Sequence, residues 1–423
     1  MVLVNKNTFY FAQAYEKVRL GKNMEAITPQ DADRIIESLV QPLSAEKVPF
    51  EQAYGCILRE PILADRDFPP FDRAMMDGIA IRFADPSRSE FTSEGIQRAG
   101  IEVQELKNEG GCFEIMTGAV VPLGCDTVIP VEEVIESGGR FSLRAGYVPE
   151  KGQFIHEQGS DNQVGDLLIP PGQILSAKEI AVVATCGYAE VEASPRPVIT
   201  IVSTGDELVD VGETPNPFQI RKSNIYALEA ACSKLPIPVE VRLDHLPDDK
   251  TVIASRLTEL IADSDVLLLS GGISKGKYDF LQELLVEAGA EKQFQWVKQR
   301  PGKPLWFGTT SEGTLIFALP GNPNSTLTCF YRYAVNSILI MAGLGKIVPE
   351  YGTLKSAYTF KPPLAHFLPV TALRSESGVL ELSPLPTQNS GDLAGLALSD
   401  GFIELPGDQN EFPVGYSAPF YPW

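Results

Sequence analysis

The stretch from residue 198 to residue 341 constrains the fold most, because short apolar runs alternate there with longer segments of helical periodicity. Almost entirely apolar runs at residues 198–202, 266–269 and 315–319 are typical of strands buried on both faces. The pattern also predicts a strand at residues 239–243 and helices at residues 223–235, 250–261, 278–288 and 325–341. This alternation favours a mostly parallel, doubly wound α/β sheet.

The segments on either side of this stretch differ in character. From about residue 55 to residue 147, short alternating runs broken by glycines predict a β-rich region. Beyond residue 348 the helical periodicity disappears and prolines, glycines and alternating runs return, which predicts a small all-β domain. Two capping boxes, Thr28 with Asp31 and Ser176 with Glu179, predict the starts of two further helices.

Composition narrows the class of protein. The 423 residues carry a formal charge of −20, which disfavours nucleic acid or an anionic membrane surface as a partner. The longest apolar runs are far short of the ~20 residues that span a bilayer, and residues 1–15 lack the apolar core of a signal peptide. Six scattered cysteines and three separated histidines favour reduced thiols in a cytoplasmic setting over disulfides or a zinc site.

Three loops of the α/β region follow predicted strands, and in a doubly wound sheet such loops bind ligands. Glycines in them let backbone N–H groups approach an anion, and the following helix N-terminus adds partial positive charge. Phosphate or another oxyanion is the implied ligand. The loops supply Ser203, Thr204 and Glu207 in the first, Gly271, Gly272, Ser274 and Asp279 in the second, and Pro320, Gly321, Asn322 and Pro323 in the third.

A fourth segment, Arg300-Pro301-Gly302-Lys303-Pro304, places two cations on a turn held by prolines, which could clamp a phosphate. Each feature also has a purely structural interpretation. The glycine loops could be tight turns only, Glu207 a solvated acid, and Asp279 a helix cap. In the β-rich region, Asp77 and Thr117 lie in segments that a structural turn would equally explain.

In order along the chain, these segments resemble the MoeA family of molybdopterin molybdenumtransferases, which includes the E domain of gephyrin. The resemblance runs through FDRAMMDG, IMTGAVVPLGCDTVIPVEE, QVGDLL, IVSTGDEL, SGGISKGKYDF, RPGKP, ALPGNPNS, QNSGDL and LALSDGFIELP. It implies a division into a leader at 1–26, a linker-like domain at 27–55 and 147–196, a β-rich insertion at 56–146, a molybdopterin-binding α/β domain at 197–346 and a C-terminal barrel-like β domain at 347–423.

The resemblance also implies an activity. Members of the family insert molybdate into adenylylated molybdopterin with the help of a divalent cation such as Mg²⁺, and AMP leaves. The protein would be a cytoplasmic homodimer whose site is shared between subunits, with a molybdopterin adenylyltransferase as upstream partner. By motif, the catalytic set would be Asp77, Thr117, Asp161, Glu207 and Asp279, of which Glu207 and Asp279 would hold the metal.

The substrate-binding set that follows from the loops and the resemblance together is Ser203, Thr204, Gly271, Gly272, Ser274, Arg300, Lys303, Pro320, Gly321, Asn322, Pro323 and Ser390. The chain departs from the family pattern at several places, where Lys275, Lys277, Arg221, Lys222, His156, Ser160 and Arg300 replace the usual residues. Most of these changes add positive charge or remove an acid. They leave a divergent, non-catalytic molybdopterin-binding or assembly protein as the alternative to an active enzyme, and a gephyrin-like scaffold as a third hypothesis.

Overall fold

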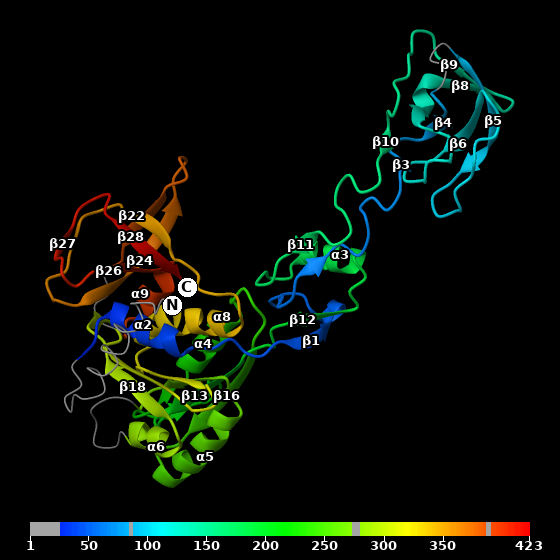
Figure 1. Ribbon diagram of the computed structural model, residues 1–423. Helices are drawn as coiled ribbons and strands as arrows, with labels where there is room; N and C mark the ends of the chain where they lie inside the picture. The colour runs from blue at the N-terminus through cyan, green and yellow to red at the C-terminus, as the bar shows by residue number, and fades with distance from the viewer. Residues whose placement is uncertain (1–25, 84–87, 273–279, 386–390) are drawn as a thin grey trace, which may run out of the picture. The chain divides into compact units, whose positions relative to one another are not determined.

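The computed structural model describes residues 26–83, 88–272, 280–385 and 391–423, which fall into two compact units. The first unit takes its described residues from 1–47, 53–59 and 192–423, and the second comprises 48–52 and the described part of 60–191. Among the described residues, the first unit holds two six-stranded sheets and the second unit holds one (Figure 1). The short strands β1 (Glu46–Pro49) and β12 (Glu190–Ala193) each span a boundary between units.

The central sheet of the first unit contains four parallel strands, as the sequence predicts, and two antiparallel ones. The parallel strands pair in the order β16 (Glu240–Leu246), β13 (Val198–Thr204), β17 (Val266–Ser270) and β21 (Leu315–Leu319). Strands β20 (Pro304–Thr309) and β18 (Glu291–Trp296) extend this sheet in antiparallel fashion. The sequence analysis does not predict these two strands. β18 alternates polar and aromatic residues, and no turn dipeptide marks the connection before β20.

Helices cover both faces of this sheet. α5 (Lys250–Ala262) and α6 (Leu281–Glu287) bury Leu257 and Leu284 against Leu267 and Leu269 of β17, in one core cluster. Because side chains alternate along a strand, the remaining residues of β17 face the opposite side of the sheet. α4 (Asn224–Cys232) contacts β13 and also packs on α7 (Pro323–Cys329).

The strand order identifies where a ligand can bind. The chain runs from β13 to the neighbouring β16 and then returns to β17 on the other side of β13. This reversal of strand order is a topological switch point, and the loops at the carboxyl ends of β13 and β17 diverge there to leave a crevice. The residues after β13 and β17 are those that the sequence analysis predicts to bind a ligand.

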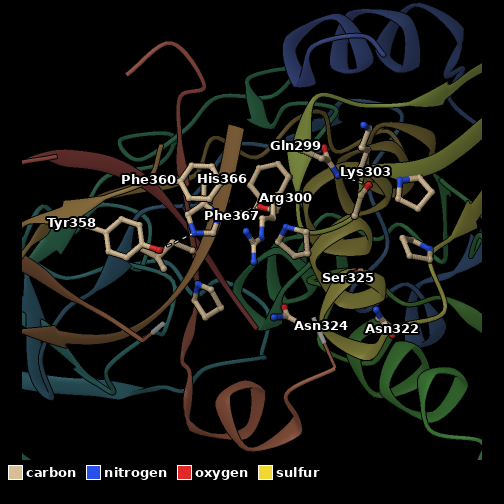
Figure 2. Close-up of a pocket in the computed structure, with 16 residues that line it drawn as sticks. Gln299, Arg300, Lys303, Asn322, Asn324, Ser325, Tyr358, Phe360, His366 and Phe367 are labelled. Carbon is tan, nitrogen blue, oxygen red and sulfur yellow. Dashed lines mark hydrogen bonds between the residues drawn. The ribbon is translucent and has the colours of Figure 1, made fainter. Parts of the chain in front are cut away.

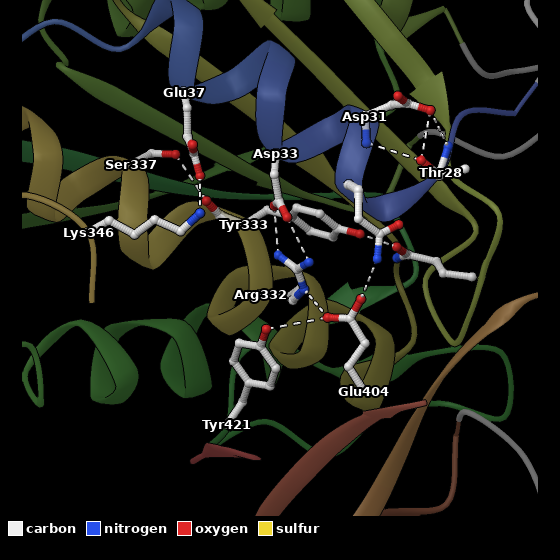
Figure 3. Close-up of polar contacts among 12 residues, drawn as sticks. Thr28, Asp31, Asp33, Glu37, Arg332, Tyr333, Ser337, Lys346, Glu404 and Tyr421 are labelled. Carbon is white, nitrogen blue, oxygen red and sulfur yellow. Dashed lines mark hydrogen bonds and ion pairs between the residues drawn. The ribbon is translucent and has the colours of Figure 1, made fainter. Parts of the chain in front are cut away.

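The helix predicted at 325–341 begins earlier and is interrupted. Its first part is α7, a π-helical segment η3 spans Phe330–Ala334, and α8 continues over Val335–Met341. Within η3, Arg332 is only 7% exposed and makes two hydrogen bonds of 2.7 and 2.8 Å to Asp33 and one of 2.7 Å to Glu404 (Figure 3). Burial alone would lower the pKa of Arg332, but the carboxylates of Glu404 and Asp33 raise it well above its ordinary value.

These contacts join three parts of the first unit. Asp33 lies on α2 (Pro29–Leu39), whose capping box of Thr28 and Asp31 is confirmed, and Glu404 lies on β26 (Gly401–Leu405). Tyr421 donates a further hydrogen bond of 3.3 Å to Glu404. The buried guanidinium therefore connects α2 and the C-terminal β domain to the helices of the α/β sheet.

The C-terminal β domain is a barrel. Strands β24 (Ala365–Arg374), β25 (Leu380–Pro384), β22 (Glu350–Leu354), β28 (Ser417–Pro422) and β26 pair in this order, and β26 pairs again with β24. The interior holds Leu368, Val370, Leu382 and Ile403, among others. Outside the ring, β19 (Gln299–Arg300) pairs with β24, and the shorter elements are β23 (Tyr358–Thr359), β27 (Glu411–Phe412) and α9 (Leu393–Leu398).

The second unit is mostly β, as the glycine-broken pattern predicts. Its sheet has the order β7 (Thr127–Pro130), β4 (Gly78–Ile81), β6 (Gly111–Ile115), β5 (Glu90–Gln97), β9 (Arg140–Leu143) and β8 (Val134–Ser137). The capping box of Ser176 and Glu179 begins α3 (Ala177–Thr185), as expected. Two short strand pairs complete the unit, β2 (Ile62–Leu63) with β11 (Leu167–Ile169) and β3 (Arg73–Ala74) with β10 (Ile155–His156).

All six cysteines are free thiols. Burial raises the pKa of Cys112, Cys125, Cys232 and Cys329 to about 12, so these groups stay protonated and unreactive near neutral pH. Within the described ranges, every helix is too short or too polar to cross a bilayer.

Candidate functional site

A cavity of about 160 Å³ lies at the carboxyl ends of β13, β17 and β21, and we call it the strand-end pocket. It is lined by residues that the sequence singled out and by others that it did not: Ser203, Thr204, Glu207, Leu208, Ile220, Arg221, Lys222, Ser223, Asn224, Ile225, Ser270, Gly271, Gly321, Asn322 and Pro323. The structure thus brings together predicted residues from all three loops. Part of the rim is the short strand pair β14 (Leu208–Val209) and β15 (Ile220–Arg221).

Close packing explains the glycines of the second loop. Gly271 has a φ of +103°, and a Cβ at this position would come within 2.9 Å of Thr204 Oγ1. A Cβ on Gly272 would lie 3.1 Å from the same hydroxyl oxygen. Since both residues also have positive φ angles, any side chain here is strained as well as crowded. The backbone after β17 can therefore approach the hydroxyl-bearing end of β13 only with glycine at these positions.

Asn224, which the sequence analysis does not predict as a site residue, connects two of the loops by hydrogen bonds. Its Nδ2 donates hydrogen bonds of 2.8 Å to Ser270 Oγ and of 2.8 Å to Gly321 O. A backbone carbonyl only accepts, so the amide nitrogen must face Gly321, and the side-chain orientation is fixed by chemistry. Asn224 stands first in α4, so the signal that the sequence offered was its place near the start of the helix predicted at residues 223–235.

The pocket carries one carboxylate beside two cations. Glu207 is exposed at the pocket wall. Lys222 forms an ion pair of 3.0 Å with Asp210, and Arg221 Nε donates a hydrogen bond of 3.1 Å to the carbonyl of Glu213. Arg221 and Lys222, which depart from the family pattern, therefore place positive charge at this pocket. Asp210 and the carbonyl of Glu213, which lie outside the pocket lining, hold the two side chains in place.

A second cavity in the first unit, of about 440 Å³, lies between the cationic turn, residues 300–303, and the barrel (Figure 2). It is lined by Gln299, Arg300, Pro301, Gly302, Lys303, Pro304, Pro320, Asn322, Asn324, Ser325, Tyr358, Phe360, His366, Phe367, Leu368 and Pro369. We call it the cationic-turn pocket. Arg300 and Lys303 are exposed, and neither forms an ion pair with a described carboxylate. Their charges are therefore available to an anion.

Strand direction explains why this turn reaches the same edge of the sheet as the glycine loops. β20 runs antiparallel to β21, with Trp306 opposite Ala318. The start of β20 consequently lies beside the end of β21, and the turn before β20 lies near the loop after β21. Asn322 of that loop lines both pockets.

The cationic turn is closed by a buried side chain. Gln299 is fully buried, and its Nε2 donates a hydrogen bond of 2.9 Å to Gly302 O. The hydroxyl of Tyr333, from η3, donates in turn to Gln299 Oε1. Gly302 has a φ of +79°, and a side chain there would overlap the sulfur of Cys329. This part of the chain is therefore packed into one conformation rather than left as a free loop.

In the second unit, Asp77 and Thr117 meet. The backbone N–H and the hydroxyl of Thr117 donate hydrogen bonds of 2.7 and 2.8 Å to Asp77 Oδ1. These bonds, first the one from the backbone and then the one from the side chain, lower the pKa of Asp77. Asp77 also lines a cavity of about 300 Å³ with the apolar residues Ile96, Met116, Val131 and Phe141.

Replacing Thr117 by valine is expected to raise the pKa of Asp77 toward its ordinary value without reaching it, because the backbone N–H remains. A carboxylate with a lowered pKa in the folded state stabilises the fold above the unfolded pKa of ~3.9. That contribution disappears as the pH falls through the folded value. NMR titration of the Asp77 carboxyl carbon checks this; an unchanged midpoint would show that the hydroxyl contributes nothing.

Asp161, the second predicted carboxylate of this unit, is held by a chain of two side chains. His156 Nε2 lies 2.9 Å from Asp161 Oδ1, and its Nδ1 lies 3.1 Å from the Nη2 of Arg73. A guanidinium only donates, so Nδ1 accepts and Nε2–H donates to the carboxylate. His156, one of the residues that depart from the family pattern, therefore contacts the predicted acid directly.

Several predicted residues lie outside the described residues: Ser274, Asp279 and Ser390, and with them Lys275 and Lys277. Within the described parts of the chain, no three His, Cys, Asp or Glu residues are close enough together to hold a metal ion by themselves. Any cation at Glu207 would therefore need oxygen ligands from hydroxyls, from the undescribed residues or from the substrate.

Comparison with known proteins covers nearly the whole chain. A family model of the MoeA N-terminal region (domain I and II) matches residues 27–187, a probable molybdopterin binding domain matches residues 200–339, and the MoeA C-terminal region (domain IV) matches residues 351–423. The crystal structure of a molybdopterin biosynthesis MoeA protein from Pyrococcus horikoshii is similar, with a TM-score of 0.79 and 28% identity, covering 94% of this chain and 99% of that chain.

Two curated relatives are named molybdopterin molybdenumtransferase. The relative from Synechocystis is 39% identical over 374 residues, which is 88% of this chain and 93% of the relative. The relative from Staphylococcus aureus is 30% identical over 400 residues, which is 93% of this chain and 94% of the relative. The fold, the loop motifs and these matches agree along the chain, which therefore belongs to the MoeA family.

Proposed function

We propose that the chain is an enzyme of molybdenum cofactor biosynthesis, a molybdopterin molybdenumtransferase that inserts molybdate into adenylylated molybdopterin and releases AMP. The observation that carries this proposal is the pair of adjoining pockets that share Asn322. One offers hydroxyls, glycine backbone and a carboxylate, and the other offers two cations that have no carboxylate partner among the described residues. A phosphorylated substrate and a separate tetrahedral oxyanion require such a combination.

The residues of the two pockets would bind different ligands, the phosphates of the pterin in one pocket and molybdate in the other. The backbone N–H of Gly271 already donates to Leu319 O, so Gly271 would serve to bring the backbone close to the ligand. The backbone N–H of Gly272, with the hydroxyls of Ser203 and Thr204, would bind and orient phosphate oxygens at the strand-end pocket. Arg300 and Lys303 would hold molybdate next to it, since a planar guanidinium and an ammonium both donate to oxyanions. Pro320, Gly321 and Pro323 would shape the wall between the two.

The oxygen donors of the strand-end pocket fit Mg²⁺. Glu207 supplies a carboxylate beside two hydroxyls, and Mg²⁺ in proteins is held by one or two carboxylates together with substrate phosphates and water. We propose Glu207 and Asp279 as its protein ligands. When bound, the cation would offset the negative charge that develops on the phosphate oxygens as AMP leaves.

The test is to incubate the purified chain with adenylylated molybdopterin, Mg²⁺ and molybdate, and to measure AMP by chromatography. Molybdate-dependent release of AMP is expected. Binding of the adenylylated pterin without AMP release would instead support the second candidate, a non-catalytic molybdopterin-binding or assembly protein. The observation that favours this candidate is the positive charge of Arg221 and Lys222 at the pocket. If the chain neither binds the adenylylated pterin nor releases AMP, only the scaffold hypothesis is left.

Asn224 should be needed for binding of the pterin substrate. Replacing it by aspartate puts a carboxylate against Gly321 O, so affinity near pH 7 should fall by roughly tenfold. Protonation of the new carboxyl group below about pH 5 restores one donor, and affinity should then partly recover. The isosteric Asn224→Leu variant lacks any donor and should show no recovery. Affinities measured across pH by fluorescence titration check this, and equal pH profiles for the two variants would contradict it.

We further propose a homodimer in which Asp77 and Thr117 of one subunit complete the site of the other. Asp77 is exposed, and beside it Met116 and Val131 are 48% and 53% exposed, although both are apolar. An exposed apolar rim around a functional carboxylate is typical of a surface that a second chain covers. Sedimentation of the purified chain measures the stoichiometry.

Subunit mixing tests the shared site. An inactive Asp77→Asn variant mixed with an inactive Glu207→Gln variant should recover part of the wild-type AMP release, because one site of each heterodimer carries neither change. Subunit exchange is followed independently with differently tagged chains. Absence of recovery despite exchange would count against a site shared between subunits.

The remaining expectations stay proposals: the four-domain division at residues 56–146, 197–346 and 347–423 with the split N-terminal domain, a cytoplasmic location, and a molybdopterin adenylyltransferase as the protein that supplies the substrate. Asp161 is proposed as a further catalytic carboxylate, and Ser390 as part of the substrate pocket.

A further inference from the structure

A histidine of the barrel is buried against the cationic turn. His366 lies on β24, is 8% exposed and lines the cationic-turn pocket (Figure 2). Its Nδ1 lies 3.2 Å from the backbone carbonyl oxygen of Arg300, and its Nε2 lies 3.1 Å from the hydroxyl of Tyr358. Both nitrogens therefore have a partner, and one of these partners is the first residue of the turn.

The partners fix the protonation of the ring. A carbonyl oxygen only accepts, so Nδ1 carries the proton and donates to Arg300 O. In the neutral ring Nε2 then accepts, and the Tyr358 hydroxyl donates to it. Burial, together with the nearby charge of Arg300, lowers the pKa of His366 to about 4. The ring is therefore neutral, with one defined tautomer, throughout the neutral pH range.

Aromatic stacking fixes the ring in space. The Phe360 ring lies parallel to the His366 ring, with centroids 4.0 Å apart and 8° between the planes. The Tyr358 ring is stacked at 5.7 Å. With its plane held in this way, the imidazole can direct Nδ1–H toward one position only, which Arg300 O occupies.

The backbone supports the same contact. β19 pairs in parallel with β24, so that Arg300 lies opposite His366 and Gln299 opposite Ala365. The N–H of Ala365 also donates a hydrogen bond of 3.0 Å to Lys298 O. Gln299 closes the turn from the side of the α/β sheet, and His366 holds it from the side of the barrel.

We propose that His366 is a positioning residue, which holds the carbonyl of Arg300 so that Arg300 and Lys303 are presented to a tetrahedral oxyanion. The inference rests on the proposed function, in which this turn binds molybdate. It assigns the barrel a role in oxyanion affinity that requires no contact between His366 and the oxyanion. When the contact between His366 and Arg300 is lost, the turn can adopt other conformations. Part of the free energy of oxyanion binding is then used to order the turn, and the affinity falls.

The test compares two isosteric variants. His366→Leu has no donor, whereas His366→Asn places an amide nitrogen where Nδ1 stood, and both lose the stacked ring. For His366→Leu, molybdate affinity measured by calorimetry should fall roughly tenfold and KM for molybdate should rise in parallel. kcat and the affinity for adenylylated pterin should stay within twofold. His366→Asn should recover most of the molybdate affinity.

A control variant and a replacement variant separate positioning from general damage. Leu382→Ala removes buried side chain from the barrel without touching the turn, and it should lower the melting temperature but not molybdate affinity. If His366→Leu does not fold, His366→Gln serves instead. Its amide nitrogen reaches the position of Nε2 rather than that of Nδ1, so the donor to Arg300 O is lost and molybdate binding should weaken by severalfold.

The outcomes are distinguishable. Equal molybdate affinity in the wild type and His366→Leu, or no difference between His366→Asn and His366→Leu, would overturn the positioning role alone. An equal loss of affinity in Leu382→Ala would do the same, because the effect would then reflect barrel stability. If the wild type does not bind molybdate, and Lys303→Gln behaves like the wild type, the proposed function of the turn is overturned, and the inference with it.

Discussion

Replacing Glu207 by glutamine is expected to lower the rate of AMP release by about 10²–10³-fold, the loss typical of removing one electrostatic contact to developing charge. Glutamine keeps the shape of the side chain and one oxygen, but it lacks the charge that a hard cation requires. Because Glu207 is exposed at the pocket wall and has no part in the core, the melting temperature should change little. Rate and affinity are measured separately, by AMP release at saturating substrate and by direct titration of the pterin.

The chain offers a matched control in the adjacent residue. Asp206 is exposed like Glu207, but it exchanges hydrogen bonds with Asp248 and does not line the strand-end pocket. Asp206→Asn changes the net charge by the same amount and should leave AMP release nearly intact. An equal loss in both variants would indicate a general effect of charge near the crevice rather than a specific role of Glu207.

Replacing Arg332 by leucine is expected to reduce the free energy of unfolding of the first unit by about 3–5 kcal/mol, because removal of one partner leaves buried charge uncompensated. Two carboxylates depend on this guanidinium. The side chain of Glu404 is 9% exposed and that of Asp33 is 23% exposed. Chemical denaturation followed by tryptophan fluorescence measures the loss.

An exposed arginine of the barrel is the control. Arg374 pairs with Glu350, and the two side chains are 58% and 50% exposed. Such surface pairs contribute about 0–1 kcal/mol, so Arg374→Leu should change the unfolding free energy by no more than that. A double variant, Arg332→Leu with Glu404→Gln, should be less destabilised than the sum of the single variants, since it removes one uncompensated charge. Simple additivity would show that the two residues are not coupled.

The parallel strands and the loops after them could be predicted from the sequence, because buried strands leave a local signature. β21 occupies the predicted residues 315–319, and β13 and β17 extend one or two residues beyond theirs. Once the strands are located, the rule that ligands bind at their carboxyl ends selects the loops without further information. Residues from all three loops meet in the strand-end pocket for this reason.

The rest depends on contacts between residues far apart in the chain. Asn224 and His366 have no motif around them, and each becomes important only because folding brings it beside Gly321 or Arg300. The π-helical segment likewise has no signature in the apolar periodicity of residues 325–341, and it contains Arg332, whose partners lie on α2 and on the barrel. Asp77 and Asp161 stay predictions, because they belong to the second unit and no contact within that unit tests their role.

The antiparallel hairpin of β20 and β21 has a consequence for how the family can vary. The tip of its turn, the exposed residues 311–313, lies at the edge of the sheet opposite the pockets, so residues inserted there would lengthen a surface loop and should be neutral. One residue inserted within β20 would instead displace the cationic turn by about 3.4 Å and exchange the faces of the side chains before it. Length variation among homologues should therefore accumulate at the distal turn and be absent from β20, so that natural deletions and insertions record which end of the hairpin carries the function.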